Sequence, residues 1–191
     1  MSLPKENCTA DDYWALPEGV RAELIDGELW DLASPSRAHQ EIVMEVSARL
    51  KNHIDSHGGA CKVYPAPFAV NLFADETTFV EPDVSVVCDR GKLSERGCEG
   101  APDFVVEVVS PSNPEMDYIS KLNLYRVAGV REYWICDPRR TRARVPLRQR
   151  GSDGYVRILR DGSRRDLPRL RGQLCRHHRT DVAHGPKNMS R

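Results

Sequence analysis

Apolar residues recur along this chain with two different spacings. Ile42, Val46, Leu50 and Ile54 follow one another at every fourth position. This spacing predicts an amphipathic helix over residues 37–57, because every fourth side chain of a helix lies on the same face. Two glycines come directly after this stretch and predict the end of the helix.

Shorter apolar runs predict strands on both sides of that helix. Residues 22–32 (AELIDGELWDL) are typical of a hairpin, because the dipeptide Asp26-Gly27 favours a two-residue turn. Further strands are predicted at residues 62–73, 84–88, 104–109 and 132–136, and a second helix at residues 115–128. The segments between them, residues 74–78, 89–101 and 110–114, are predicted to be turns and loops.

The order of these elements is a hairpin, a helix, three strands, a second helix and a last strand. It predicts an α/β fold of the α+β type, in which helices flank a mixed sheet. Beyond residue 138 the pattern decays, and only residues 154–159 resemble a strand. We therefore predict one domain over residues 1–138 and a basic, poorly patterned tail over residues 139–191.

The charge is distributed unevenly between these two parts. Residues 1–138 contain 12 Lys and Arg against 24 Asp and Glu, whereas residues 139–191 contain 16 against 4. A basic end of this kind is explained by a DNA-binding arm, or by a frame-shifted or degenerated end of the reading frame. Tyr155 is its only aromatic residue, which favours the second explanation because single-strand binding surfaces use aromatic stacking.

Composition places the chain among ordinary globular proteins, with 40% apolar and 29% charged residues. No apolar run approaches the length of about 18 residues that a membrane span needs, and the N-terminus has no signal-peptide core. We therefore expect a cytoplasmic protein. The cysteines are scattered without any C-x-x-C pair, so we expect buried thiols rather than a disulfide or a zinc site. They are Cys8, Cys61, Cys88, Cys98, Cys136 and Cys175.

Two carboxylates stand at unusual places in the predicted strands. Glu107 lies in the middle of the apolar run 104–109, where an unpaired charge costs several kcal/mol. It is explained by a salt bridge, by an edge strand with Glu107 in water, or by a bound cation. Asp83 opens the preceding strand directly after a proline, which puts it at a strand end. If the two strands are neighbours, both carboxylates can converge on one divalent cation.

Lys121 and His39 lie on the apolar faces of the two predicted helices. Lys121 is therefore directed at the protein body, where it either meets an anion or extends past the face to water. His39 is either a core histidine with its hydrogen bonds satisfied or a hydrogen-bond donor near a phosphate.

Glu23 and Glu28 flank the hairpin turn. Glu28 could reach the site, and exposed pairing is expected for both. Glu41 and Glu45 are expected in solvent.

Several motifs in this chain resemble the Uma-two family of bacterial endonucleases. They are ELIDGEL, SPSRAHQEIV, EPDVSVV, GAPDFVVEVVSPS, KLNLY and AGVREYWICDP, which occur in this order between residues 20 and 138. The resemblance implies the restriction-endonuclease-like fold with its PD-(D/E)XK motif. The tail departs from the alternating strands that such a family would continue with.

The resemblance also implies a role for each matching residue. Asp83 and Glu107 become metal ligands, with the Val108 carbonyl as a third. The usual lysine position of the motif is Val109 here, so the helix residue Lys121 takes the role of that lysine. Asp103 also follows a proline, but it is the weaker candidate for the aspartate because it precedes Glu107 by only four residues on one strand.

The function expected from these residues is Mg²⁺- or Mn²⁺-dependent hydrolysis of phosphodiester bonds in DNA by an endonuclease. The catalytic residues are then Asp83, Glu107, Lys121 and, as an auxiliary contact, His39. DNA is the expected partner, and a homodimer is allowed for. Two rivals remain: an inactive nuclease-fold module that binds nucleic acid, and a structural or partner-binding protein whose three charges form an internal ion-pair network.

Overall fold

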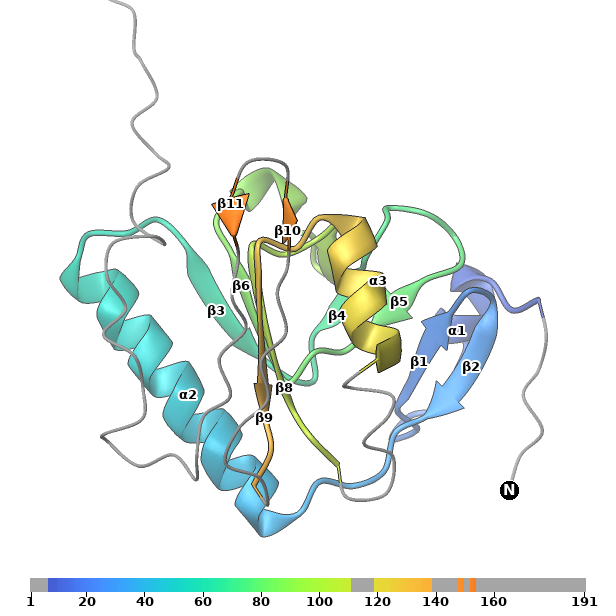
Figure 1. The fold of residues 1–191 in the computed structure, drawn as a ribbon. Coiled ribbons are helices and arrows are strands. Elements are labelled where there is room, and N and C mark those ends of the chain that lie inside the picture. Colours follow the sequence, from blue (N-terminus) through green and yellow to red (C-terminus); the bar gives the residue numbers. More distant parts are fainter. Residues whose placement is uncertain (1–6, 111–118, 139–147, 150–151, 154–191) are drawn as a thin grey trace, which may run out of the picture.

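Two mixed β-sheets form the framework of the protein (Figure 1). The structure, a computed structural model, describes residues 7–110, 119–138, 148–149 and 152–153. The five-stranded sheet has the order β2-β1-β5-β4-β7, and the four-stranded sheet has the order β3-β6-β8-β9. Each contains one parallel pair, β4 with β7 and β8 with β9. The predicted mixed sheet with flanking helices is therefore confirmed, in the form of two sheets.

The elements have the following bounds. The strands are β1 (Ala22–Ile25), β2 (Glu28–Asp31), β3 (Lys62–Pro65), β4 (Ala69–Asn71), β5 (Phe79–Val80), β6 (Val84–Val87), β7 (Gly97–Glu99), β8 (Phe104–Val108), β9 (Glu132–Cys136), β10 (Arg148–Gln149) and β11 (Ser152–Asp153). The helices are α1 (Ala10–Trp14), α2 (Arg37–Ser56), the 3-10 helix η1 (Arg90–Lys92) and α3 (Lys121–Ala128). In the described part of the chain, no helix has the length and apolar character of a membrane span.

The hairpin of β1 and β2 forms as the sequence predicts. Asp26 and Gly27 have φ angles of 50° and 80°, the left-handed conformation that a tight two-residue hairpin turn requires at both positions. The strands pair in antiparallel register from Ala22 with Asp31 to Ile25 with Glu28. β1 also pairs with β5, so the hairpin belongs to the five-stranded sheet.

Helix α2 covers one face of the four-stranded sheet (Figure 1). Its predicted apolar positions are buried against β6, β8 and β9, and each buried aliphatic side chain stabilises the fold by about 1.5–3 kcal/mol. Ser36 caps the N-terminus of this helix, because its side-chain oxygen accepts a hydrogen bond from the His39 amide (3.2 Å). This cap fixes His39 in the first turn.

Strand β8 separates the two main parts of the core by simple alternation. Phe104, Val106 and Val108 pack with α2, whereas Val105 and Val109 pack on the opposite face with α3, β4 and β5. Successive side chains of a strand point to opposite faces. The residue between positions 106 and 108 is therefore directed toward α3 and the five-stranded sheet.

The prediction of one strand over residues 62–73 is wrong. This segment forms β3 in the four-stranded sheet and then β4 in the five-stranded sheet. Pro65 and Pro67 stand at the crossing and lack the amide hydrogen that a continued ladder needs. The predicted turn at residues 74–78 is followed by the short strand β5, which was not predicted from the sequence. The predicted loop at residues 89–101 contains the short strand β7.

The second helix ends where the sequence predicts. Gly129 follows α3 in the left-handed conformation, with φ of 89°. The predicted beginning of this helix at residue 115, most of the turn at 110–114 and the strand at 154–159 lie outside the described residues.

The cysteine prediction is wrong for one pair and agrees with the structure for the other described cysteines, while Cys175 lies outside the described residues. Cys61 and Cys88 form a disulfide. Lys62 pairs with Val87 across β3 and β6, so the residues one step further lie opposite each other, a proximity that sequence spacing did not reveal. Cys98 and Cys136 are buried thiols, as expected.

Candidate active site

Glu107 is a buried carboxylate on the α3 face of β8. Its exposed fraction is 3%, so the alternative of an edge-strand side chain in water is wrong. Its Oε1 accepts a hydrogen bond from the Tyr125 hydroxyl (2.6 Å) and lies 3.1 Å from the Lys121 ammonium nitrogen. Both donors come from α3, which therefore supplies the groups that make this burial possible.

Asp83 lies beside Glu107 at the point where β6 and β8 separate. Val84 pairs with Val106, so the continued register would place Asp83 opposite Glu107. Each carboxylate accepts a hydrogen bond from a backbone amide of the neighbouring segment: Asp83 Oδ2 from the Val108 amide (2.7 Å), and Glu107 Oε2 from the Asp83 amide (3.4 Å). The structure thus brings these two predicted residues together at one end of the sheet.

Lys121 is buried, as its position on the apolar face predicts. The residue is 6% exposed, so it does not extend to water. Its Nζ lies 2.9 Å from Glu23 Oε1 and 3.1 Å from Glu107 Oε1. It therefore joins β1 of one sheet to β8 of the other through α3.

Glu23 belongs to this cluster, and the expectation that it pairs in solvent is wrong. It is 2% exposed and also accepts a hydrogen bond from the Glu81 amide (2.9 Å). The sequence signal was available, because Glu23 lies inside the short apolar run Ala22–Ile25 just as Glu107 lies inside β8. Glu28 follows the turn and is half-buried.

His39 approaches the cluster from the first turn of α2. Its Nε2 lies 3.1 Å from Asp83 Oδ2, and both side chains are 16% exposed. Because a carboxylate only accepts, Nε2 carries the proton of this contact. The other ring nitrogen, Nδ1, is buried without a hydrogen-bond partner among the described residues. The predicted auxiliary residue is therefore in contact with a predicted ligand.

Three other carboxylates considered in the sequence, Asp103, Glu41 and Glu45, have partners outside this cluster. Asp103, the rival aspartate, contacts the Cys88 amide (2.8 Å) and Arg131 (3.0 Å). Glu41 and Glu45 are on the surface of α2, paired with arginines of the same helix, as expected. Val109 is buried in the core.

The charges of the cluster change the protonation of their neighbours. Burial, and then the charges of Glu107 and Glu23, raise the pKa of Tyr125 well above its usual range. Its hydroxyl is therefore a permanent donor at neutral pH. Burial and the nearby Asp83 charge raise the pKa of the Cys136 thiol to about 12. This thiol is therefore neutral at neutral pH in the metal-free fold.

Comparison with known proteins places this chain in a family. A family model named Uma2, described as "Putative restriction endonuclease", matches residues 10–174. The chain belongs to the Uma2 family. This confirms the family that the sequence motifs indicate, and the match runs beyond residue 138 into the basic tail. The division into residues 1–138 and 139–191 stays a prediction.

Two known proteins are similar to this Uma2 chain over most of its length. The uncharacterized protein slr1290 of Synechocystis sp. is 29% identical over 161 residues, which cover 83% of this chain and 82% of the relative. The crystal structure of a putative nuclease of Anabaena variabilis, assigned to DUF820, matches with a TM-score of 0.59 at 20% identity. It covers 78% of this chain and 83% of its own. The nuclease-like fold is thereby confirmed, and family and fold together support a nuclease.

The donor set of this Uma2 chain fits a hard divalent cation. Asp83, Glu107 and the Val108 carbonyl offer oxygens, which Mg²⁺ and Mn²⁺ prefer. Among the residues that the structure describes, no group of three His, Cys, Asp or Glu side chains is arranged to enclose a metal. Mg²⁺ usually keeps several waters and needs only one or two carboxylates, so a pair of acids at a partly open strand end is compatible with it.

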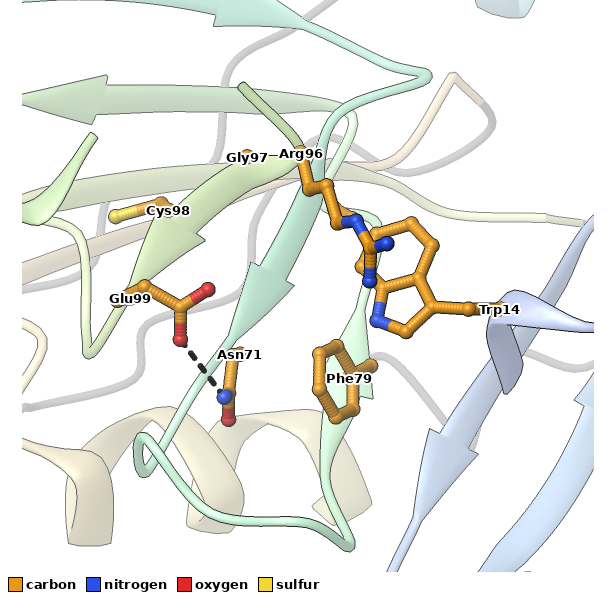
Figure 2. A pocket seen from close by; sticks show the side chains of 8 residues that line it. Trp14, Asn71, Phe79, Arg96, Gly97, Cys98 and Glu99 are labelled. Carbon is orange, nitrogen blue, oxygen red and sulfur yellow. Dashed lines mark hydrogen bonds between the residues drawn. The ribbon is translucent and has the colours of Figure 1, made fainter. Parts of the chain in front are cut away.

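A small pocket of this Uma2 chain lies away from the site. Figure 2 shows its lining, in which the Arg96 guanidinium lies 5.2 Å from the centre of the Trp14 ring and Asn71 donates to Glu99 (2.8 Å). Neither Asp83 nor any other member of the acidic cluster lines it. Because these side chains contact one another, we assign no catalytic role to this pocket.

Proposed function

We propose that this chain is a Mg²⁺-dependent endonuclease that hydrolyses phosphodiester bonds in DNA. The observation that carries the proposal is the contact between Asp83 and Glu107, each of which binds a backbone amide at or next to the other where β6 and β8 separate. Membership in a family described by restriction endonuclease activity supports the choice of DNA. Mn²⁺ is expected to replace Mg²⁺, because both prefer oxygen ligands.

The acidic pair would hold the cation from two strands. Asp83 lies at the more exposed side of the pair, since its side chain is 16% exposed against 4% for Glu107. The Val108 carbonyl would be the third protein ligand. When bound, the cation would stabilise negative charge on the scissile phosphate and lower the pKa of a bound water.

Lys121 would supply a fixed positive charge next to this pair. Two carboxylates, those of Glu23 and Glu107, lie against its ammonium at 2.9 Å and 3.1 Å. Glu23 and Glu107 hold its Nζ from two sides, so little reorganisation is needed during the reaction. Lys121 would orient the attacking water or offset charge that develops on the phosphate.

His39 would assist from the open side of the site. Its Nε2–H donates to Asp83 Oδ2, which orients both the ring and the carboxylate. When DNA is bound, this Nε2–H would be shared between Asp83 and a phosphate oxygen, which would make His39 an auxiliary donor. A homodimer and a cytoplasmic location stay predictions.

The test is cleavage of a covalently closed circular plasmid, which only an endonuclease can open. We expect nicking or linearisation by the wild type with Mg²⁺ or Mn²⁺ and none with EDTA. Asp83→Asn and Glu107→Gln should each reduce the rate at least about 100-fold, because a catalytic metal contributes several kcal/mol. Asp103→Asn is the matched control, since Asp103 pairs with Arg131 outside the cluster.

The outcomes of this test distinguish an error in the assigned site from an error in the assigned substrate. Cleavage at the wild-type rate by Asp83→Asn or Glu107→Gln would refute the assignment of the site. Cleavage of RNA, with the plasmid left intact, would refute the choice of DNA and leave the nuclease assignment standing.

One observation favours a second candidate, a structural or partner-binding protein whose charges form an internal ion-pair network. Lys121 is engaged by Glu23 as well as by Glu107, so its ammonium is held within the fold. Such a protein would bind neither Mg²⁺ nor Mn²⁺ in a calorimetric titration, and it would cut the plasmid under none of the metal conditions.

A further inference from the structure

Two residues of α3 reach the same oxygen of Glu107. Lys121 and Tyr125 are four positions apart, so they lie one above the other on a single helix face. The Tyr125 hydroxyl donates to Oε1 at 2.6 Å, and the Lys121 ammonium lies 3.1 Å from the same atom. One oxygen of this carboxylate therefore receives two donors from α3.

The other oxygen of Glu107 is directed toward β6. Oε2 accepts from the Asp83 amide at 3.4 Å. A carboxylate is planar, so a strong contact on Oε1 also sets the direction of Oε2. Donors from α3 on one side and from β6 on the other thus fix the rotation of this side chain.

Tyr125 differs from Lys121 in having one task. Lys121 is shared between Glu23 and Glu107. The Tyr125 hydroxyl, in the described part of the chain, donates its hydrogen bond to Glu107. Tyr125 is fully buried. A hydrogen bond from a neutral donor to a buried carboxylate is among the stronger ones in proteins.

We propose that Tyr125 is a positioning residue, which holds Glu107 by Oε1 so that Oε2 faces Asp83 and the divalent cation. This inference rests on the proposed function, because it assigns Glu107 as a metal ligand. When a residue that holds a metal ligand in this way is mutated, metal affinity or activity typically falls about 10–100-fold.

The experiment is titration of the full chain with Mn²⁺ by calorimetry. Tyr125→Phe removes only the hydroxyl and keeps the aromatic ring in the core. We expect its Mn²⁺ affinity to fall about 10–100-fold, while kcat for plasmid cleavage returns to the wild-type range at saturating Mn²⁺. Tyr13→Phe is the matched control: it removes a tyrosine hydroxyl that donates to another carboxylate, Glu81, at 3.4 Å, and should leave the affinity unchanged.

A second measurement separates positioning from a merely structural role. Mn²⁺ that binds the folded chain raises its melting temperature, and this rise is compared between wild type and Tyr125→Phe at one Mn²⁺ concentration. A smaller rise supports positioning. A lower melting temperature with an unchanged rise means that the hydroxyl only stabilises the fold, and overturns the inference.

The wild-type titration distinguishes a failure of the positioning role of Tyr125 from a failure of the proposed function. If the wild type binds Mn²⁺ and Tyr125→Phe binds it equally well, the positioning role is wrong and the proposed function stands. If the wild type itself binds no Mn²⁺, the proposed function fails, and the inference fails with it.

Discussion

Lys121 Nζ lies 2.9 Å from Glu23 Oε1, and this contact forms half of a link between the five-stranded and the four-stranded sheets. The side chains are 7% and 3% exposed, so the ion pair is withdrawn from water. Glu23 belongs to β1 of the five-stranded sheet, while Glu107, the other partner of Lys121, belongs to β8 of the four-stranded sheet. The charge cluster is thus a structural joint as well as a candidate active site.

Lys121→Met should destabilise the fold strongly. The substitution leaves Glu23 and Glu107 buried without their shared ammonium, and breaking a buried ion pair from one side costs about 3–5 kcal/mol. Urea unfolding followed by circular dichroism measures this loss. Lys51→Met is the control, because Lys51 forms an exposed ion pair with Asp55 and should cost less than about 1 kcal/mol. Equal, small effects of the two substitutions would show that the buried contacts are energetically unimportant.

Stability should fall at alkaline pH, and Tyr125 should account for part of the fall. Its pKa is raised in the folded protein above the ordinary value of 10.0, so the folded chain keeps a proton that the unfolded chain releases. The stabilisation is complete below pH 10 and decreases as pH rises above it. Each such group contributes about 1.4 kcal/mol per pH unit in that range.

The measurement is the free energy of unfolding at intervals from pH 9 to pH 11.5. Above pH 10 the free energy of unfolding should fall less steeply with pH in Tyr125→Phe than in the wild type. The difference in slope should be about 1.4 kcal/mol per pH unit, the contribution of one proton. Slopes are compared rather than absolute values, because the variant also loses a hydrogen bond at neutral pH. Identical slopes would mean that the Tyr125 hydroxyl ionises normally in the fold.

Reduction of the disulfide between Cys61 and Cys88 should weaken the fold without disturbing the site chemistry. The bond closes a loop with a sequence separation of 27, for which chain entropy predicts a stabilisation of about 3–4 kcal/mol. Urea unfolding with and without dithiothreitol measures it. The double variant Cys61→Ser/Cys88→Ser should be insensitive to the reductant. An equal response of wild type and double variant would contradict the pairing.

Local patterns were sufficient to predict most of the elements that carry the site. The four-residue spacing predicted α2, the Asp26-Gly27 turn predicted the hairpin, and short, mainly apolar runs predicted β6, β8 and β9. These features depend on side-chain periodicity and turn conformation, both of which are encoded over a few neighbouring residues. The inward direction of Lys121 followed from the same periodicity.

Long-range relationships were not visible in the sequence. The division of residues 62–73 between two sheets depends on which strands pair, and the opposition of Cys61 and Cys88 depends on the register of β3 against β6. Glu23 was misjudged because a short run beside a turn suggested exposure. Its burial results from the packing of β1 against α3, which unites segments about a hundred residues apart.

The number of Mn²⁺ ions bound per chain, measured by equilibrium dialysis, tests the central claim that Asp83 and Glu107 together hold one cation. The wild type is expected to bind one Mn²⁺ ion per chain, and Mg²⁺ is expected to displace it. Asp83→Asn and Glu107→Gln are each expected to remain folded and to bind no ion. Retention of the ion in both variants, or no binding by the wild type, would contradict the account.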